Sequence, residues 1–200
     1  MPQPRRPRGA DIPDTETRLV ARAQAGDMDA FEQLAGAHAD RLFAVLLRLL
    51  GNRSEAEDVA QEVMLRAWRG IGRFHGRSLF FTWLYRIAIN EANRSLEKST
   101  RRPVSVSIDA EVLQAPADAR DEPSRRLEQT ELRTALNKAL AGLPPDYRTA
   151  IVLRDVEGLS TQEAAEIAGV GLAAFKSRLH QARLRVRAAI GDEALIDADR

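Results

Sequence analysis

The sequence contains no cysteine and few aromatic residues, which make up 5% of its 200 residues. Without cysteine there are no disulfide bonds, no thiol catalysis and no zinc sites with cysteine ligands, as suits a reducing cytoplasm. The longest apolar run, over 42–50, is interrupted by Arg48 and is far shorter than the roughly 20 residues of a membrane-spanning helix. The Pro- and Arg-rich residues 1–14 lack the apolar core of a secretory signal. We therefore expect a cytoplasmic protein without membrane insertion, preceded by a disordered tail.

A strong excess of one charge is also absent, because 30 Lys and Arg stand against 29 Asp and Glu. Only the distribution of charge can therefore indicate a partner. Strand-type alternation is lacking, whereas apolar residues recur at helical spacing nearly everywhere. The three histidines, His38, His75 and His180, lie far apart without ligand-like spacing, so we expect no metal site and no cofactor.

Residues 103–124 differ in composition from the rest of the chain. Three prolines, an acidic bias and no sustained period predict a flexible linker there. Helical patterns on both sides predict an all-α fold with two small helical domains, over 15–102 and 125–190, and an acidic tail over 191–200. Domains of this size bury only about 60% of their unfolded surface, so each is expected to be modestly stable and to lean on a partner.

Local signals place several helix ends. Capping boxes predict helix starts at Ser54 with Glu57 and at Ser160 with Glu163. Three glycines fit helix ends: Gly51, Gly72 and Gly158.

The carboxy-terminal domain has the pattern of a helix-turn-helix. A short helix over 161–168 precedes a glycine-containing turn over 169–171 and a longer helix over 172–189. One face of the longer helix is apolar: Phe175, Leu179, Ala182, Val186 and Ala189. Between Lys176 and Arg187 there are five Lys or Arg and no acidic residue, which suits a phosphate polyanion. The alternative is a solvated basic helix end that complements its own dipole.

The amino-terminal domain combines an aromatic cluster with an acidic helix. Six of the ten aromatic residues lie within 68–85, and basic residues follow them. Rings beside cations suit the unstacked bases of single-stranded nucleic acid, although we expect about half of these rings to fill the core instead. The helix predicted over 55–71 has an apolar face (Val59, Val63, Ala67 and Ile71) and an opposite face (Asp58, Gln61, Glu62 and Leu65). That opposite face suits protein docking, or is a solvated acidic first turn.

Four stretches together carry a family resemblance: AEDVAQEVMLRAWRGIGRF (56–74), FTWLYRIAINEANRSLEKSTRRP (81–103), LPPDYRTAIVLRDVEGLSTQEAAEIAGV (143–170) and FKSRLHQARLRVR (175–187). They resemble the extracytoplasmic-function (ECF) sigma factors of bacterial RNA polymerase over nearly all of the chain outside the tail and the linker. The resemblance implies a transcription initiation factor, not an enzyme, with a sigma two-like domain for core polymerase and −10 DNA and a sigma four-like domain for the −35 element.

The resemblance also implies roles for particular residues and partners. Docking on the clamp helices of the largest polymerase subunit falls to Asp58, Gln61, Glu62 and Leu65, and the flap of the second largest subunit is a further contact. Capture of flipped bases in single-stranded −10 DNA falls to Tyr85, Arg86, Asn90, Asn93 and Arg94. In the −35 duplex, bases are read by Lys176, Ser177, His180 and Gln181, and phosphates are held by Arg178 and Arg183. The linker lets the two domains fold against each other or onto an anti-sigma factor.

Two departures from the family pattern bear on promoter choice. Ala173 and Ala174 stand where the family usually has Gly-Thr, which removes a hydroxyl that could touch phosphate. Gln181 stands where Arg is frequent, and Gln favours adenine where Arg favours guanine. The main rival hypothesis is a stand-alone helix-turn-helix regulator that binds duplex DNA without polymerase. A hydrolase or transferase has no support, since the sequence shows no glycine-rich phosphate loop, no cysteine and no Ser-His-Asp spacing.

Overall fold

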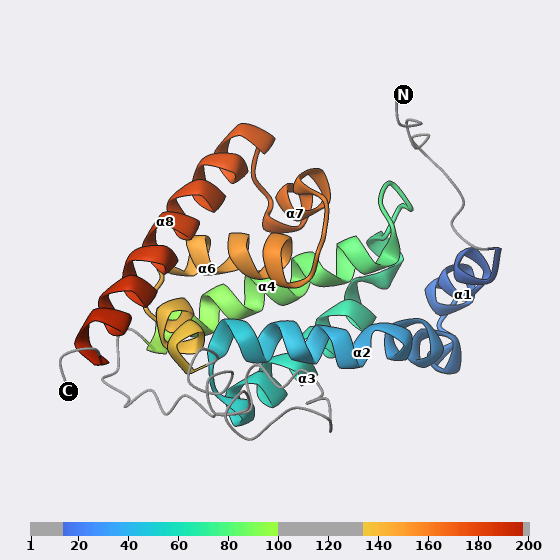
Figure 1. Ribbon diagram of the computed structural model, residues 1–200. Coiled ribbons are helices and arrows are strands. Elements are labelled where there is room, and N and C mark those ends of the chain that lie inside the picture. Colours follow the sequence, from blue (N-terminus) through green and yellow to red (C-terminus); the bar gives the residue numbers. More distant parts are fainter. Residues whose placement is uncertain (1–13, 100–133, 198–200) are drawn as a thin grey trace, which may run out of the picture.

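The computed structural model describes residues 14–99 and 134–197, and all regular structure in these ranges is helical. The front half consists of α1 (Asp14–Gln24), α2 (Met28–Leu50), α3 (Arg53–Gly70), a 3₁₀ turn η1 (Ile71–Arg73) and α4 (Phe80–Ser99). Helices α2, α3 and α4 pack against one another, and α1 lies at the end of this bundle where α2 begins (Figure 1).

The back half starts with a helical segment over 134–141. It continues with α6 (Pro145–Ile151), a π-helical turn η3 (Val152–Val156), α7 (Thr161–Ala168) and α8 (Leu172–Asp197). Helix α8 packs across α6 and α7 and extends beyond the predicted end at Ala189. The all-α fold is confirmed, whereas the predicted linker and residues 1–13 fall outside the described residues.

Helix α3 begins earlier than predicted. Its cap is Asn52, whose Oδ1 accepts a hydrogen bond from the backbone N–H of Glu55 at 2.9 Å, so Ser54 lies inside the helix. Gly51 ends α2 in the left-handed conformation at φ 73°, as predicted, and Asn52 is then the first residue able to cap the next helix. Gly72 lies within η1 rather than ending a helix, so that prediction is wrong.

The ends of α7 agree with the prediction. The backbone N–H of Ser160 donates to Glu163 Oε2 at 2.9 Å, and the backbone N–H of Glu163 donates to Ser160 Oγ at 3.2 Å, which completes the capping box. Gly169 ends the helix at φ 69°. This geometry fixes the angle at which the chain turns into α8.

The core of the front half lies between α2, α3 and α4. The predicted apolar face of α3 is buried throughout: Val59, Val63, Ala67 and Ile71. It meets leucines of α2 and small or apolar residues of α4, among them Leu42, Leu46, Leu49, Leu84, Ala88 and Ala92. Helical periodicity therefore placed this core correctly.

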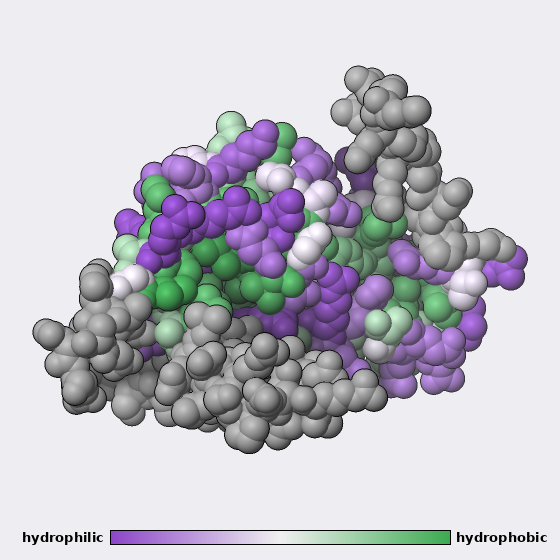
Figure 2. All heavy atoms as spheres, in the orientation of Figure 1, coloured by the Kyte–Doolittle hydropathy of each residue, from purple (hydrophilic) through white to green (hydrophobic). Residues whose placement is uncertain are grey.

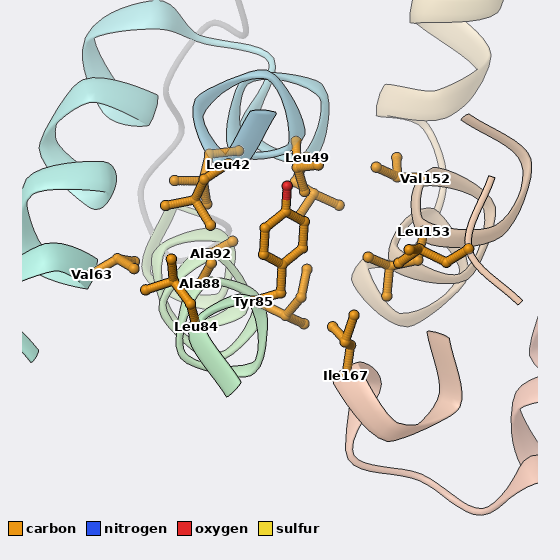
Figure 3. Close-up of a cluster of buried hydrophobic side chains, with 14 of the residues drawn as sticks. Leu42, Leu49, Val63, Leu84, Tyr85, Ala88, Ala92, Val152, Leu153 and Ile167 are labelled. Carbon is orange, nitrogen blue, oxygen red and sulfur yellow. The ribbon is translucent and has the colours of Figure 1, made fainter. Parts of the chain in front are cut away.

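The two halves of the chain are not separate bodies in this structure, because they share one hydrophobic core. Tyr85 of α4 has no accessible surface and lies where the halves meet. Figure 3 shows its ring below Leu49 of α2, with Val152 and Leu153 of η3 and Ile167 of α7 on the right. Helix α7, the first helix of the helix-turn-helix, packs directly on α4.

Polar contacts also join the halves. Glu157, which directly follows η3, has a side chain only 6% exposed, and its carboxylate pairs with Arg41 Nε at 2.9 Å and Arg48 Nη1 at 2.8 Å. Arg41 Nη2 donates to the backbone carbonyl of Glu157 at 2.9 Å. Arg148 of α6 is buried and its Nη1 donates to the carbonyl of Leu49 at 2.5 Å. We call this arrangement the closed arrangement.

Candidate nucleic-acid interface

Helix α8 presents one face to the core and another to solvent. Phe175, Leu179 and Ala182 are buried, as their spacing predicted. The four residues predicted to read duplex bases are all exposed: Lys176, Ser177, His180 and Gln181. Figure 2 shows hydrophilic residues along the outer side of α8, above hydrophobic ones that lie between α8 and α6. The exposed face of α8 is therefore accessible to a large partner in the closed arrangement.

The two arginines predicted to hold phosphates are engaged within the chain. Arg178 Nη2 pairs with Asp146 Oδ2 at 2.9 Å. Arg183 donates two hydrogen bonds to Asp155, from Nη2 to Oδ1 at 2.6 Å and from Nε to Oδ2 at 2.9 Å. Hydrogen bonding to Asp155 is the main cause that raises the pKa of Arg183. Both arginines would have to exchange these partners before binding phosphate.

The predicted docking face of α3 is on the surface, opposite its apolar face. Asp58, Gln61 and Leu65 are exposed, and Leu65 keeps 50% of its surface. Glu62 is half-buried and pairs with Arg66 Nε at 2.6 Å. An exposed leucine among acidic and polar side chains suits a protein partner with a basic or polar rim.

The residues predicted to capture −10 bases are only partly brought together. Arg86, Asn90 and Arg94 are exposed, while Asn93 is half-buried and its Oδ1 has no hydrogen-bond partner among the described residues. Tyr85 is fully buried, because the back half packs over it, and its role in base capture stays a prediction. Burial is the main cause that raises the pKa of its hydroxyl, whose oxygen has no hydrogen-bond partner in the described part of the chain.

A groove of about 410 Å³ lies between the carboxyl end of α3 and the outer face of α4. Its walls contain four arginines, one tryptophan, one glutamate and three uncharged residues: Arg66, Arg69, Arg73, Arg94, Trp83, Glu91, Gly70, Ile87 and Asn90. We call it the arginine groove. Cations around an aromatic ring are the combination that single-stranded nucleic acid binds.

The ring of Trp83 is held in place from three sides. It lies 5.4 Å from the Phe74 ring and 5.6 Å from the Phe80 ring between centroids. Gly70 completes the contact, since a Cβ at that position would lie 3.4 Å from the tryptophan ring. Gln24 of α1 donates to the carbonyl of Phe74 at 2.7 Å, so α1 supports the segment that leads into α4.

Sequence reasoning missed five charged or aromatic residues of this groove as site residues: Arg66, Arg69, Arg73, Trp83 and Glu91. The signal was present, because positions 66, 69 and 73 of the α3 region and positions 83, 87, 90 and 94 of α4 each recur at helical spacing. The prediction treated the aromatic cluster as a unit, whereas the structure buries Phe74, Phe80 and Tyr85 and leaves Trp83 at the groove.

Within residues 14–99 and 134–197, no group of three or more His, Asp or Glu side chains could hold a metal ion. No helix in the described residues is both long and apolar enough to span a bilayer.

Comparison with known proteins identifies both halves of the chain. The family model for Sigma-70 region 2 matches residues 34–102, and the model for Sigma-70, region 4 matches residues 133–186. The first match contains α3, α4 and the arginine groove. The second contains the helix-turn-helix and the exposed face of α8.

Two curated relatives match most of their own length. The RNA polymerase sigma-H factor of Pseudomonas aeruginosa is 35% identical over 175 residues, covering 85% of this chain and 91% of the relative. The ECF RNA polymerase sigma-E factor of Haemophilus influenzae is 37% identical over 174 residues, covering 84% of this chain and 92% of the relative.

Two solved structures have a similar fold. The structure of CnrH in complex with the cytosolic domain of CnrY matches with a TM-score of 0.60 and 27% identity, over 94% of this chain and 100% of that one. The sigma factor RpoE of Bartonella quintana, in complex with the anti-sigma factor NepR, matches with a TM-score of 0.63 and 26% identity. The match covers 80% of this chain and 96% of that one. With both sigma regions in order and relatives matched nearly from end to end, this chain belongs to the ECF family of RNA polymerase sigma factors.

Proposed function

We propose that this chain binds core RNA polymerase, directs it to specific promoters through the −10 and −35 elements, and promotes local opening of the DNA. The observation that carries this proposal is the presence of two different nucleic-acid-compatible surfaces on one chain, the exposed face of α8 and the arginine groove. The chain supplies specificity to the polymerase in the cytoplasm and has no catalytic activity of its own.

The exposed face of α8 suits duplex DNA. A helix with side chains is about 10–12 Å wide, and the major groove of B-DNA is about 12 Å wide. Lys176, Ser177, His180 and Gln181 project from one side of α8 and reach base edges when the helix enters the groove. Gln181 can bind adenine through two hydrogen bonds. Arg178 and Arg183 hold flanking phosphates after leaving Asp146 and Asp155.

The arginine groove suits the single-stranded −10 element. Extruding a base from the stack costs a few kcal/mol, and stacking on an aromatic side chain returns about 1–3 kcal/mol per base. Trp83 offers such a ring, and Arg66, Arg69, Arg73 and Arg94 surround it with positive charge. Arg86 and Asn93 extend this surface along α4, whereas Tyr85 stays covered until the halves separate.

Polymerase binding uses other surfaces. We assign Asp58, Gln61, Glu62 and Leu65 to the clamp helices of the largest subunit. A second candidate is an apolar groove between the 134–141 segment, α6 with η3, and α8, which includes Leu136, Leu140, Ile151, Val156, Val186 and Ile190. Its apolar walls suit the flap of the second largest subunit. The complexes of CnrH with CnrY and of RpoE with NepR also support an anti-sigma partner for this chain.

Binding both promoter elements requires the closed arrangement to open. The two elements lie ~25 base pairs apart, which at about 3.4 Å per pair is roughly 85 Å along the duplex. A compact chain of 200 residues has a radius of gyration of only about 16 Å. The helix-turn-helix and the arginine groove therefore cannot contact both elements of a straight duplex while α7 remains packed on α4.

The decisive experiment combines purified chain with core polymerase and maps RNA start sites on genomic DNA. We expect a stable assembly and RNA from a limited set of start sites. Replacing Asp58→Lys together with Gln61→Lys should abolish the assembly, whereas the same replacements at exposed Glu32 and Gln33 of α2 should leave it intact. A chain that binds promoter duplex but never associates with polymerase would instead be the stand-alone regulator.

A further inference from the structure

The arginine groove contains one acidic side chain, Glu91 of α4. It is 9% exposed and lies among four arginines of the groove walls. Its Oε1 pairs with Arg66 Nη1 at 3.1 Å and with Arg94 Nη1 at 2.7 Å. One carboxylate oxygen thus joins an arginine of α3 to an arginine of α4.

The second oxygen of this carboxylate is available. The recorded contact of each ion pair is to Oε1, and Oε2 accepts no hydrogen bond within the part of the chain that the structure describes. Glu91 Oε2 is not one of the fully buried side-chain atoms without a hydrogen-bond partner. Because it has no such partner, it must keep some accessible surface. A carboxylate oxygen accepts hydrogen bonds and repels other acceptors such as phosphate.

The bases differ in what they offer to such an oxygen. Adenine and cytosine each carry an exocyclic amino group that donates hydrogen bonds, and guanine carries one at N2. Thymine has no amino group, and its one donor, the ring N3–H, lies between two carbonyl oxygens that a carboxylate repels. Asn90, Glu91 and Arg94 line the same groove as Trp83 but lie two to three turns further along α4, roughly 10–17 Å at 1.5 Å per residue. An unstacked base bound in that part of the groove, beyond the one stacked on Trp83, has its edge among them. The acidic oxygen there favours an amino group and disfavours a carbonyl.

We propose that Glu91 is a specificity-determining residue, whose free carboxylate oxygen accepts a hydrogen bond from the exocyclic amino group of an unstacked base and disfavours thymine. This inference rests on the proposed function of the arginine groove. It assigns Glu91 a task beyond holding Arg66 and Arg94, because a purely structural acid would affect all bases alike.

The first test leaves the protein unchanged and alters the DNA. The full chain is titrated with fluorescent single-stranded oligothymidines of about ten nucleotides that carry adenine, cytosine, guanine or thymine at one central position, within the usual range of site sizes. We expect the three amino-bearing bases to bind about tenfold more tightly than thymine. A fifth oligonucleotide carries purine without the amino group in place of adenine, and its affinity should fall to that of the thymine oligonucleotide.

The second test changes the protein. Glu91→Gln keeps the size of the side chain but adds a donor that can meet thymine, so the preference against thymine should disappear. Glu57→Gln is the matched control, because it removes one negative charge from α3 at an exposed ion pair with Arg53 outside the groove. That control should keep the tenfold preference. Circular dichroism and thermal melting verify that both variants fold.

The outcomes separate the two proposals. If all oligonucleotides bind but the amino-free purine binds as tightly as adenine, the inference about Glu91 is wrong and the groove remains a strand-binding site. An equal loss of affinity for every base in Glu91→Gln would likewise make Glu91 a purely structural residue. If no oligonucleotide binds either the free chain or its assembly with polymerase, the role of the groove and the role of Glu91 both fall.

Discussion

Replacing Glu157 by glutamine should open the closed arrangement. The Glu157 carboxylate is the acidic partner of two arginines of α2, at 2.9 Å from Arg41 and 2.8 Å from Arg48. These are ion pairs between residues more than a hundred positions apart, and they cross from the back half to the front half. Glutamine fills the same space but cannot balance either positive charge.

The size of the effect follows from the exposure of each partner. The Arg41 side chain is 50% exposed, so its pair contributes only about 0–1 kcal/mol after solvent screening. Arg48 is 22% exposed and Glu157 6%, which places their pair between a surface pair and a fully buried one, where removing one partner costs about 3–5 kcal/mol. A total of about 2–4 kcal/mol shifts the ratio of open to closed molecules by roughly 30- to 800-fold.

The absence of native cysteine makes the measurement direct. Cysteines introduced at exposed Gln33 of α2 and Gln162 of α7 take one donor and one acceptor dye, and single-molecule energy transfer then reports the separation of the halves. The wild-type chain should show mainly high transfer and Glu157→Gln a new low-transfer population. Glu57→Gln, which removes an exposed pair within α3, should behave as wild type. Identical distributions for wild type and Glu157→Gln would refute the reasoning.

Three further predictions concern other parts of the chain. Burial next to Phe80 and Phe81 is the main cause that lowers the pKa of His38 below 6.5, so near that pH the unfolded chain binds more protons than the folded chain. The contribution of His38 to stability should therefore be complete above pH 6.5 and be lost as the pH falls below it. His38→Gln should flatten this part of a profile of melting temperature against pH. Ser160→Ala should cost about 1 kcal/mol in urea unfolding, with recovery in Ser160→Asp, because the first helix of the helix-turn-helix loses its cap. Gln181→Arg should move the preference at one −35 position from adenine to guanine in a promoter-library selection, while a uniform change in affinity would indicate a phosphate contact.

Local patterns in the sequence were sufficient for individual helices. The capping box at Ser160 and the glycine at 169 predicted both ends of α7, because those signals act through hydrogen bonds within a few residues. The start of α3 was harder, since Asn52 and Ser54 are both good caps. Only the position of Gly51, which ends α2, makes Asn52 the residue that is used.

Contacts between distant segments could not be predicted in the same way. Tyr85 lies one helical turn from Phe81, and its ring is 4.3 Å from that ring between centroids, so its place near a core was readable from spacing. What covers it was not readable, because Val152 and Ile167 reach α4 only through the tertiary arrangement. The arginine groove has the same origin, as its arginines and Trp83 come from different helices.

The closed arrangement also contains an interaction that opposes it. Arg148 is 8% exposed, and its guanidinium donates to carbonyl oxygens of Leu49, Ala141 and Leu143, with no carboxylate among these partners. Leu49 belongs to the last turn of α2, whose negative dipole end favours a cation, yet burial still lowers the pKa of Arg148 and its Nε has no partner in the described residues. Separation of the halves would break the bond to Leu49 and return the guanidinium to water, and this rehydration offsets part of the free energy needed to expose the shared core and break the Glu157 ion pairs. Because the arrangement is held by the shared core and the Glu157 ion pairs and opposed by the burial of Arg148, a partner that binds the open chain has to supply the difference between these free energies.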